Sequence, residues 1–493
     1  MHLERINPYS IAKQHNKDKL HILERIEQLF DSGSFVEQYP LNENSVSEYD
    51  GVITGYGNIF GSRVYFYGQD FTYMGGTFGY QHSQQIIAIL KEALKNKKPI
   101  IGIYDGGGAR IQEGAAAVAG CGELFRYNAM ASGVIPQIAV IAGTCAGGAV
   151  YSPGLMDFVF TIDDVSNMFV TGAKVVNEVQ GTNYLIEELG GAKIHASVSG
   201  VAHFRDSNER SCFRRVRALV DLLPPCFSES LNYRTRRYQR KDLWNIEKLL
   251  PKDHHAPYDV KMVICELLDD DSFIEVHEEF AKNIVVGLGR LGGITVGVVA
   301  NQTWCKNGSI DCDSADKAAR FVQFLDCYNI PIITLADSTG FVMEAEQEHK
   351  GLIRHGAKMI QAYAQATTIK LTVILRKGYG GPYIFMGCKQ LGADRHYVWP
   401  GAEVAVMKAE GAVAVICQGT LRQMHGEEKK KYLQQQIEKY RACYMNSRVV
   451  LENGFVDEEI RPELTREILY NDMIRLSNKK EKMIERKHAN MPV

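Results

Sequence analysis

The chain has 493 residues, which is too long for one hydrophobic core and predicts more than one domain. Hydrophobic residues make up 45% and charged residues 23%, as in ordinary globular proteins, and the formal net charge is −2. The sequence has no basic stripe and no apolar run of membrane-spanning length, which argues against nucleic-acid binding and membrane insertion. We expect a cytoplasmic protein or, in a eukaryote, one that a cleaved segment directs to an organelle.

The 11 cysteines form no CxxC pair and no cluster with histidine at metal-ligand spacing. Cys121, Cys145, Cys305 and Cys312 stand singly in apolar or glycine-rich surroundings, which is typical of buried free thiols. We therefore expect no metal in this chain.

The first predicted element is a helix from about Leu20 to Phe30, which ends at the turn signal Asp31-Ser32-Gly33. Four strand-like runs follow it: GVITGYG, RVYFYGQD, PIIGIYDG and IPQIAVIAG. Between the second and third runs, HSQQIIAILKEALKNKK places on one helix face the residues Ile86, Ile87, Leu90 and Leu94. A hairpin followed by alternating strands and helices predicts an α/β layered fold.

Most of this pattern is present twice. The segment PIIGIYDGGG, which ends at Gly108, returns as PIITLADSTG, which ends at Gly340, 232 residues later. Other landmarks keep nearly the same spacing: Gly55 with Gly287, Gly76 with Gly308, and Gly147-Gly148 with Gly380-Gly381. A period of this length indicates two whole domains of one fold rather than a solenoid. Two copies placed face to face would form a cleft with a glycine-rich turn from each wall.

We place the two domains at residues 1–249 and 250–493, with the cut inside the polar, basic and proline-containing stretch 224–257. Near the end, EEKKKYLQQQIEKYRACY predicts a long polar helix, and a second helix follows NGFVDEEIRP. Such an appendage often docks on a neighbouring subunit. The lysine run 429–431 and the basic tail from Asn478 are expected to be solvated helix faces.

One motif is misleading. Gly287-Leu-Gly289-Arg-Leu-Gly292 matches the dinucleotide fingerprint GxGxxG. That fingerprint must lie between a strand and a helix, whereas this one precedes the β-branched run ITVGVVA. We interpret it as part of a hairpin and expect no nicotinamide or flavin site.

A second glycine-rich segment, Gly143-Thr-Cys-Ala-Gly147-Gly148-Ala-Val-Tyr-Ser152, follows the last strand-like run and leads into a predicted helix. Small residues let a ligand approach the backbone, and free N–H groups at a helix start can hold a developing negative charge. Close packing of the helix on the sheet explains the same residues equally well. The second half has a similar element at Lys408-Ala-Glu410-Gly411-Ala412-Val413.

A third segment, Asp105-Gly-Gly-Gly108-Ala-Arg110-Ile-Gln-Glu113-Gly, also follows a strand. Arg110 suits two parallel hydrogen bonds to an anionic ligand, and a structural pair with Glu113 is the equal alternative. No Ser/His/Asp or Cys/His arrangement stands out. The histidines of interest are more typical of structural residues than of general bases: His82, His195, His203 and His355. We expect the chemistry to depend on backbone amides.

These motifs and several longer stretches resemble the carboxyltransferase (β) subunit of biotin-dependent acyl-CoA carboxylases, in the propionyl-CoA and acetyl-CoA carboxylase branch. The resemblance covers nearly the whole chain; matching stretches include QDFTYMGGTFG, GGARIQEGAAAVAGCGELF, IPQIAVIAGTCAGGAVYSP, GLIRHGAKMIQAYAQAT and WPGAEVAVM. It implies two tandem crotonase-like (ClpP/crotonase) α/β domains related by internal duplication. It also implies a homohexamer of two trimeric rings, in which the N-terminal domain of one subunit holds acyl-CoA and the C-terminal domain of another receives carboxybiotin.

The resemblance also implies residue roles. As two oxyanion holes, Gly147 and Gly148 would hold the thioester oxygen, and Gly411 and Ala412 the ureido oxygen of biotin. Further substrate-binding positions are Gly107, Gly108, Ala109, Arg110, Ala146 and Ala414, and further biotin-binding positions are Gly340, Phe341, Gly380 and Gly381. Removing a proton beside a thioester places charge on its oxygen, and loss of the carboxyl group from carboxybiotin places charge on the ureido oxygen, which can then act as the base.

The implied activity is transfer of the carboxyl group from carboxybiotin to the α carbon of a short-chain acyl-CoA, propionyl-CoA or acetyl-CoA. The chain has no biotin-attachment MKM and no ATP-grasp region, so the biotin carboxyl carrier protein and the biotin carboxylase are expected on separate chains. Two alternatives stay open. One is the reverse reaction, decarboxylation or transcarboxylation of methylmalonyl-CoA or a related carboxyacyl-CoA; the other is a non-catalytic or specialised acyl-thioester binder.

Two segments depart from the family pattern. The family usually has DVPGF where this chain has Asp337-Ser-Thr-Gly-Phe341, and the Pro-Gly that normally follows is replaced over 342–346. In the first half, NEVQGTN stands in place of a threonine-rich TGE. These segments, 177–183 and 338–348, border the CoA and biotin regions, so the acyl group and the direction of transfer stay open. Ala414 lies just past the second pocket, where family members differ with acyl preference.

Overall fold

The structure is a computed structural model that describes residues 8–38, 49–229, 243, 246–481 and 484–492. The chain divides into two compact units, Met1–Ser230 with His277–Phe280, and Leu231–Val276 with Ala281–Val493. The cut that the sequence predicts after residue 249 stays a prediction. Part of the stretch around it, residues 230–242 and 244–245, lies outside the described residues.

The first unit is built on a sheet with eight strands in its described part: β1 (Val36–Glu37), β2 (Val52–Ile59), β3 (Ser62–Gln69), β4 (Ile100–Gly106), β5 (Gln137–Ala146), β6 (Phe158–Ile162), β7 (Asn167–Phe169) and β8 (Phe204–Asp206). The strand order is β1-β2-β3-β4-β5-β6-β8, and β7 pairs with the end of β5. The predicted hairpin is β2–β3, and the neighbours from β3 to β8 are parallel.

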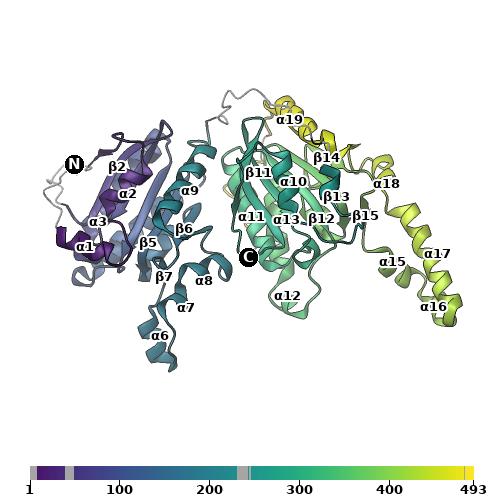
Figure 1. The fold of residues 1–493 in the computed structure, drawn as a ribbon, viewed down its shortest axis with the longest axis horizontal. Helices are drawn as coiled ribbons and strands as arrows, with labels where there is room; N and C mark the ends of the chain where they lie inside the picture. The colour runs from purple at the N-terminus through teal and green to yellow at the C-terminus, as the bar shows by residue number, and fades with distance from the viewer. Residues whose placement is uncertain (1–7, 39–48, 230–242, 244–245, 482–483, 493) are drawn as a thin grey trace. The chain divides into compact units, whose positions relative to one another are not determined.

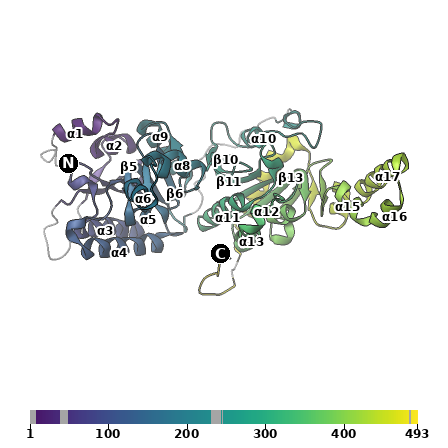
Figure 2. The same ribbon diagram turned by 90° about the horizontal axis from the view of Figure 1, so that it is seen from below.

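Helices cover both faces of this sheet: α1 (Pro8–His15), α2 (Ile22–Leu29), α3 (Tyr80–Asn96), α4 (Ala115–Ala131), α5 (Tyr151–Gly154), α6 (Ala173–Gln180), α7 (Ile186–Gly190), α8 (Ala192–Ser197) and α9 (Glu209–Leu222). Figure 2 shows α3 and α4 on one side of the strands and α2 and α9 on the other. Ile86, Ile87 and Leu90 of α3 are buried, and Leu94 packs against the same core, which confirms the predicted apolar face. Because both faces are covered, β4 is buried along its whole length.

The second unit repeats this plan with β9 (Ile274–Val276), β10 (Ile284–Leu291), β11 (Ile294–Asn301), β12 (Ile332–Ser338), β13 (Lys370–Tyr379), β14 (Arg395–Val398), β15 (Glu403–Ala405) and β16 (Glu458–Glu459). Its order is β9-β10-β11-β12-β13-β14-β16, with β15 beside β13. Every strand of one sheet therefore has a counterpart in the other, which confirms the internal duplication. Strands β10 and β11 pair from Leu291↔Ile294 outward, so the GxGxxG segment lies in a hairpin, as predicted.

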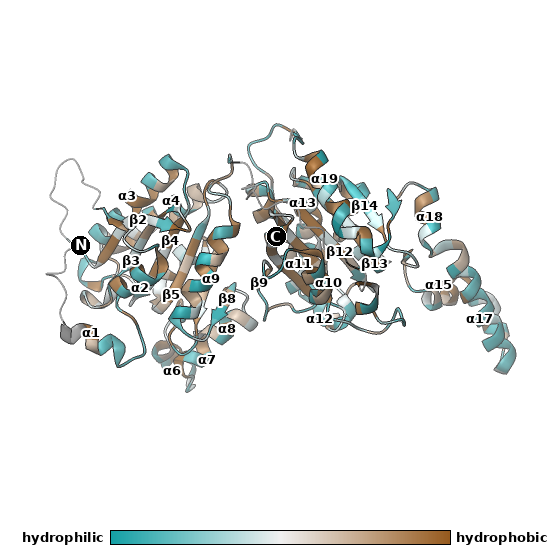
Figure 3. Ribbon diagram, turned by 45° about the horizontal axis from the view of Figure 1, so that its top comes forward, coloured by the Kyte–Doolittle hydropathy of each residue, from teal (hydrophilic) through white to brown (hydrophobic). Residues whose placement is uncertain are grey.

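The helices of the second unit are α10 (Val260–Leu267), α11 (Cys312–Cys327), α12 (Ala345–His349), α13 (Leu352–Gln365), α14 (Gly381–Phe385), α15 (Ala409–Ile416), α16 (Gln418–Gln423), α17 (Gly426–Tyr444), α18 (Ser447–Glu452) and α19 (Thr465–Leu476). The predicted long polar helix is α17, which is mostly teal in Figure 3 and projects with α15 and α16 from the sheet in Figure 1. The second predicted helix is α19.

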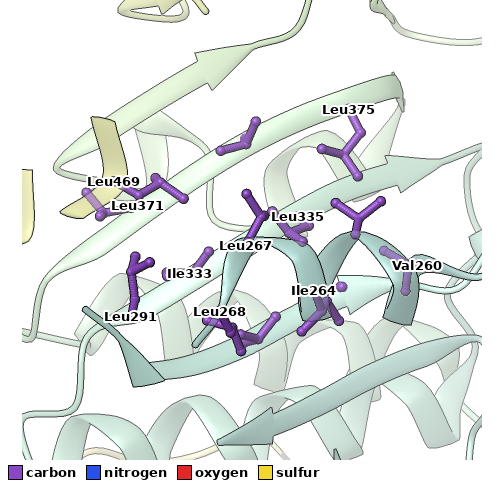
Figure 4. Close-up of a cluster of buried hydrophobic side chains, with 14 of the residues drawn as sticks. Val260, Ile264, Leu267, Leu268, Leu291, Ile333, Leu335, Leu371, Leu375 and Leu469 are labelled. Carbon is purple, nitrogen blue, oxygen red and sulfur yellow. The ribbon is translucent and has the colours of Figure 1, made fainter. Parts of the chain in front are cut away.

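Apolar side chains from α10 and α19 form the core on one face of the second sheet. Figure 4 shows Ile264 and Leu267 of α10 meeting Leu335 and Leu371 of the strands, with Leu469 of α19 beside them. Each of these side chains is almost fully buried, and burying one Leu or Ile stabilises the fold by about 1.5–3 kcal/mol. This core holds α10 against β10 and β11.

Two sequence expectations differ from the structure. Strand β5 continues past Gly143 to Ala146, because the three residues of β7 pair with Thr144–Ala146 and extend the ladder.

The basic tail from Asn478 is not helical in its described residues. Lys479 there donates to the carbonyl oxygen of Thr368 at 3.0 Å and to Asp394 at 2.9 Å, contacts that hold an extended chain on the surface.

Candidate active site

The first candidate pocket is the turn at the end of β5, where the 3₁₀ helix Gly147–Val150 begins. Gly147 has φ +63°, a conformation that favours glycine. Gly148 has ordinary backbone angles, and no heavy atom of the described residues beyond its neighbours lies within 4 Å of where a Cβ would stand. The fold therefore needs a glycine at 147 and none at 148. The space in front of both glycines is open, and their role as ligand-binding residues stays a prediction.

The segment after β4 forms the neighbouring wall of this pocket. Gly108 has φ +94°, and a Cβ there would lie 2.7 Å from the carbonyl oxygen of Ala146. Ala109 forms an isolated bridge with Phe78, and the Gly107 N–H donates to the Gly75 carbonyl at 3.2 Å. The structure thus brings Gly108 and Ala146, which the sequence placed in one site, into direct contact.

Arg110 is buried and ion-paired. Its Nη1 lies 2.7 Å from Asp50 Oδ1 and 2.7 Å from Glu113 Oε1, and its Nη2 donates to the Thr77 carbonyl at 3.2 Å. These carboxylates raise the pKa of Arg110 against the opposing effect of burial. The Arg–Glu pair that the sequence left as an alternative is therefore present, and a contact of Arg110 with substrate stays a prediction.

A buried polar network supports the turn from behind. Ser152 of α5 donates to Asn128 Oδ1 at 2.8 Å and lies 2.7 Å from the Tyr104 hydroxyl, which in turn meets the hydroxyl of Tyr67. Burial raises the pKa of the Cys145 thiol, just before the turn, to about 12, so this thiol is not a nucleophile at neutral pH. These side chains position the turn and leave backbone amides as its reactive groups.

The second candidate pocket is the first turn of α15. Ala412 donates its N–H to the Lys408 carbonyl at 3.0 Å, whereas Gly411 lies one residue earlier, where N–H groups have no intrahelical acceptor. A Cβ at Gly411 would make only an ordinary contact, 3.5 Å from Met407 Sδ. Glycine inside a helix costs about 1 kcal/mol relative to alanine, so the fold gains nothing from it here. Ala414 is exposed on the same helix.

The predicted biotin-side residues after β12 and β13 meet in the structure. A Cβ at Gly381 would overlap the Phe341 ring, which also packs edge-on against Phe385 with ring centroids 4.9 Å apart. Gly380 has φ +60° and Gly340 has φ +133°. Beside this pair lies an apolar cavity of about 650 Å³, lined by residues that include Gly380, Gly381, Tyr383, Val404 and Tyr444.

A buried carboxylate lies beneath each glycine turn, and sequence reasoning missed its partners. Asp105 pairs with Lys19 at 2.6 Å and Arg25 at 3.0 Å, and Arg25 also pairs with Glu209 at 2.7 Å. Asp337 pairs with Arg376 at 2.8 Å and Lys377 at 3.4 Å. Asp337 follows Asp105 by the repeat spacing of 232 residues, and that spacing was the available signal.

In both units an amide side chain bridges two backbone segments, and the sequence analysis did not identify it. Gln69 donates to the Gly76 carbonyl at 2.9 Å and accepts from the Asp105 N–H at 2.9 Å. Asn301 donates to the Gly308 carbonyl at 3.0 Å and accepts from the Asp337 N–H at 3.1 Å. Each amide ties the turn after the hairpin to the strand that precedes the candidate pocket.

The histidines have structural partners. Burial lowers the pKa of His82 to about 4, and its Nδ1 lies 2.8 Å from the Asp50 carbonyl oxygen. His195 lies 2.8 Å from the Met168 carbonyl oxygen, and His355 lies 2.8 Å from Asp316.

In the described part of the chain, no group of three His, Cys, Asp or Glu residues is placed to hold a metal ion. No helix within the described ranges is long and apolar enough to cross a membrane.

The two divergent segments adopt defined conformations. Residues 177–180 complete α6, and Asn177 then holds the turn, accepting from the Tyr184 N–H at 2.8 Å and donating to its carbonyl at 2.9 Å. After Phe341, the second segment exposes Met343 before α12 begins. Their effect on substrate choice stays a prediction.

The model of the carboxyl transferase domain family matches residues 13–491. This chain belongs to that family. It is 44% identical over 500 residues to a putative propionyl-CoA carboxylase beta chain of Bacillus subtilis, covering 98% of this chain and 96% of that protein. It is 41% identical to the methylmalonyl-CoA decarboxylase subunit alpha of Veillonella parvula, with 98% and 95% coverage.

The solved structures agree. Transcarboxylase 12S, a hexamer assembly solved with methylmalonyl-CoA bound, superposes with a TM-score of 0.94 at 37% identity and covers 99% of this chain and 95% of its own. The chain is therefore an enzyme of the carboxyltransferase family, with two crotonase-like α/β domains.

Proposed function

We propose that this carboxyltransferase moves a carboxyl group from carboxybiotin, carried on a separate protein, to the α carbon of propionyl-CoA or acetyl-CoA. The observation that carries the proposal is the presence of Gly148 and Gly411 at positions where the fold requires no glycine. Each lies at the start of a helical turn that borders open space, so each suits a reacting oxygen that comes close to the backbone.

In the first unit, the amides of Gly147 and Gly148 hold the thioester oxygen. Removing a proton from the adjacent α carbon puts negative charge on that oxygen, and preorganised N–H groups stabilise this charge more than they stabilise the neutral substrate. Gly107, Gly108, Ala109 and Ala146 shape the approach, and Ala414 leaves room beside the other pocket for the acyl group.

In the second unit, the first turn of α15 holds the ureido oxygen of biotin. The biotin ring supplies the carboxyl group, and its ureido oxygen gains negative charge as that group leaves. Gly411 donates from the positive end of the helix dipole, which favours an anion there. A donor role for Ala412 requires its amide to share the hydrogen bond to Lys408. Gly340, Phe341, Gly380 and Gly381 form the wall beside the ring.

The partners follow from the same proposal. A biotin carboxyl carrier protein and a biotin carboxylase on separate chains would supply carboxybiotin, and the relatives named as beta chains or subunits support this division. A homohexamer is supported by the assembly of transcarboxylase 12S. A cytoplasmic location remains part of the proposal.

An exchange experiment tests the proposal. The purified full chain is mixed with free biotin and with malonyl-CoA, methylmalonyl-CoA or longer carboxylated acyl-CoAs, and biotin-dependent loss of the labelled carboxylate is measured. We expect Gly148→Val and Gly411→Val each to lower this rate by at least about 100-fold, the cost of losing one oxyanion donor. Both variants should keep the melting temperature of the wild type.

Matched glycines serve as controls. Gly154 on α5 and Gly419 on α16 also border open space and have ordinary backbone angles. Gly154→Val and Gly419→Val should therefore retain activity. Equal losses in all four variants would contradict the assignment of the pockets. A folded wild type that binds acyl-CoA without any exchange would instead support the third possibility, a specialised acyl-thioester binder.

A second candidate is the reverse reaction, decarboxylation or transcarboxylation of a carboxyacyl-CoA. It is favoured by the 41% identity to a methylmalonyl-CoA decarboxylase subunit and by the similarity to transcarboxylase 12S. The same two pockets serve both directions. Comparing the initial rates with carboxybiotin plus propionyl-CoA and with methylmalonyl-CoA plus biotin decides which direction the purified chain favours.

A further inference from the structure

The buried charge clusters of the two units differ in their charge balance. Asp105 and Glu209 balance Lys19 and Arg25 in the first unit. In the second unit, Asp337 alone faces Arg376 and Lys377, and no other carboxylate of the described residues pairs with either cation. Asp337 therefore faces two basic side chains, and burial lowers the pKa of Lys377 against the attraction of Asp337.

The strand registers explain how this difference arose. Tyr104↔Ile141 in the first sheet corresponds to Ala336↔Ile374 in the second, so Gly143 and Arg376 occupy equivalent positions. A Cβ at Gly143 would overlap the Asp105 carboxylate, which explains the glycine there. In the second unit the cation itself occupies this strand position, and its guanidinium reaches the Ala256 carbonyl just before α10.

A cavity of about 430 Å³ lies beside Arg376. It is bounded by the middle of β13, by Trp399 and Pro400 just after β14, by the segment before α10 and by Pro462. Three further basic residues line it: Lys248, Lys252 and His254. No carboxylate is among its described lining residues.

Arg376 lines this cavity and also belongs to the buried cluster around Asp337. Its guanidinium is held by Nε on Asp337, by Nη1 on the Ala256 carbonyl at 3.0 Å, and over the Tyr258 ring at 4.4 Å. Only 2% of Arg376 is exposed, and its Nη2 has no hydrogen-bond partner in the part of the chain that the structure describes. Asp337 Oδ1 and the Tyr258 hydroxyl in the same cluster also have no hydrogen-bond partner among the described residues, so this buried cluster is incompletely hydrogen-bonded, which is rare in native proteins.

We propose that this cavity binds a phosphate group, free or as a phosphate monoester, which supplies the negative charge that Glu209 supplies in the first unit. Lysines bind phosphate as point charges, and Nη2 is the guanidinium nitrogen that has no acceptor among the described residues. A phosphate carries more charge than a carboxylate at neutral pH and so suits a cavity with several cations. This site is separate from the glycine pockets and does not depend on the proposed transfer reaction.

The test is calorimetric titration of the full chain with inorganic phosphate at constant ionic strength, repeated with glycerol 3-phosphate and with propionate. We expect one saturable site per chain for phosphate and weaker binding of propionate. Lys252 is exposed and has no ion pair within the described ranges, so Lys252→Gln should fold normally. It should weaken phosphate binding about fivefold, the effect of removing one charge at short range in water.

Lys429→Gln is the matched control, because Lys429 is an exposed lysine of the same unit on α17, away from the cavity. It should bind phosphate as the wild type does. Arg376→Met should abolish binding, but it also leaves Asp337 without its nearest partner, so Lys252→Gln is the decisive variant. If phosphate shows no saturable binding, if Lys252→Gln binds unchanged, or if propionate binds as tightly as phosphate, the proposal is wrong. Competition between glycerol 3-phosphate and inorganic phosphate shows whether monoesters share the site.

Discussion

The turn after β5 and the turn after β13 each begin with a glycine of positive φ and differ in what lies against them. Gly147 and Gly380 have φ +63° and +60°. Gly148 faces open space, whereas the Phe341 ring fills the space before Gly381. The same turn can therefore receive an oxygen in the first unit and serves as a packing surface in the second.

In the second unit Phe341 covers the turn after β13, whereas Gly411 in the first turn of α15 has only an ordinary contact. Under the proposed function, the second unit therefore takes its donor from α15 and not from the duplicated turn. The buried clusters beneath the turns have also diverged, from a balanced set around Asp105 to an unbalanced one around Asp337.

The largest expected effect comes from removing the two buried carboxylates. Asp105→Asn leaves Arg25 paired with Glu209, whereas Asp337→Asn leaves Arg376 and Lys377 without a carboxylate partner among the described residues. Breaking a buried pair costs about 3–5 kcal/mol, and we expect Asp337→Asn at the upper end and Asp105→Asn at the lower end. Urea unfolding measures both. Equal losses would show that the difference in charge balance has no energetic consequence.

The amide bridges should be equivalent in the two units. Gln69→Met and Asn301→Leu each leave one buried carbonyl and one buried N–H without a partner. At about 1–3 kcal/mol for each unsatisfied group, we expect a loss of about 2–6 kcal/mol in the free energy of unfolding for either variant. Gln434→Met, on the exposed surface of α17, should change it by less than about 0.5 kcal/mol. If only one of the two variants lost stability, the two amide bridges would not be equivalent.

Acid should destabilise both units through one buried histidine in each. Burial lowers the pKa of His82 and of His396 to about 4, below the ordinary value of 6.5. Between pH 6.5 and pH 4 the unfolded chain therefore binds more protons, and the free energy of unfolding falls as the pH falls. Each histidine contributes up to about 1.4 kcal/mol per pH unit in this window.

Variants isolate this effect. His82→Gln and His396→Gln should each reduce the slope of unfolding free energy against pH between 6.5 and 4, measured by urea unfolding at several pH values. The wild-type chain, measured in parallel, gives the reference slope. An unchanged slope in the His82 and His396 variants would mean that other groups cause the acid sensitivity.

The smallest effect concerns the paired glycines themselves. Gly381→Ala forces a Cβ into the Phe341 ring, and we expect a loss of about 1–3 kcal/mol, typical of overpacking. Gly148→Ala meets open space and should leave stability unchanged or raise it by up to about 1 kcal/mol. The melting temperatures of both variants, measured by thermal unfolding, test this difference in stability. A destabilised Gly148→Ala would show that the first turn is also a packing surface.

Much of the fold was predictable because its signals are local or repeated. The glycine spacing of 232 residues identified the duplication, and period-3.6 and β-branched patterns identified α3, α17 and the hairpin strands. Short strands carry no such pattern. β7 and β15 have three residues each, so the extension of β5 to Ala146 depends on a pairing that no local sequence signal records.

The sequence identified the glycines of the candidate site, but not the side chains that pair or pack beneath them. Gly147, Gly148 and Gly411 stand out as small residues after strands or at helix starts. Arg25 reaches Asp105 from a helix 80 residues earlier in the chain, and the equivalent cation in the second unit stands on the strand itself. Because the partner moved between elements, the repeat spacing does not reveal it. The contact of Phe341 with Gly381 likewise depends on the tertiary fold.

The most direct test of the account measures the two ligands separately in two variants. Gly148→Val should weaken binding of methylmalonyl-CoA at least about tenfold, because the valine side chain occupies the place of the thioester oxygen, and should leave the KM for biotin unchanged. Gly411→Val should raise the KM for biotin and leave methylmalonyl-CoA binding unchanged. This crossed result is the one the account predicts. If both variants lost binding of the same ligand, or if neither variant lost binding of any ligand, the assignment of one pocket to each unit would be contradicted.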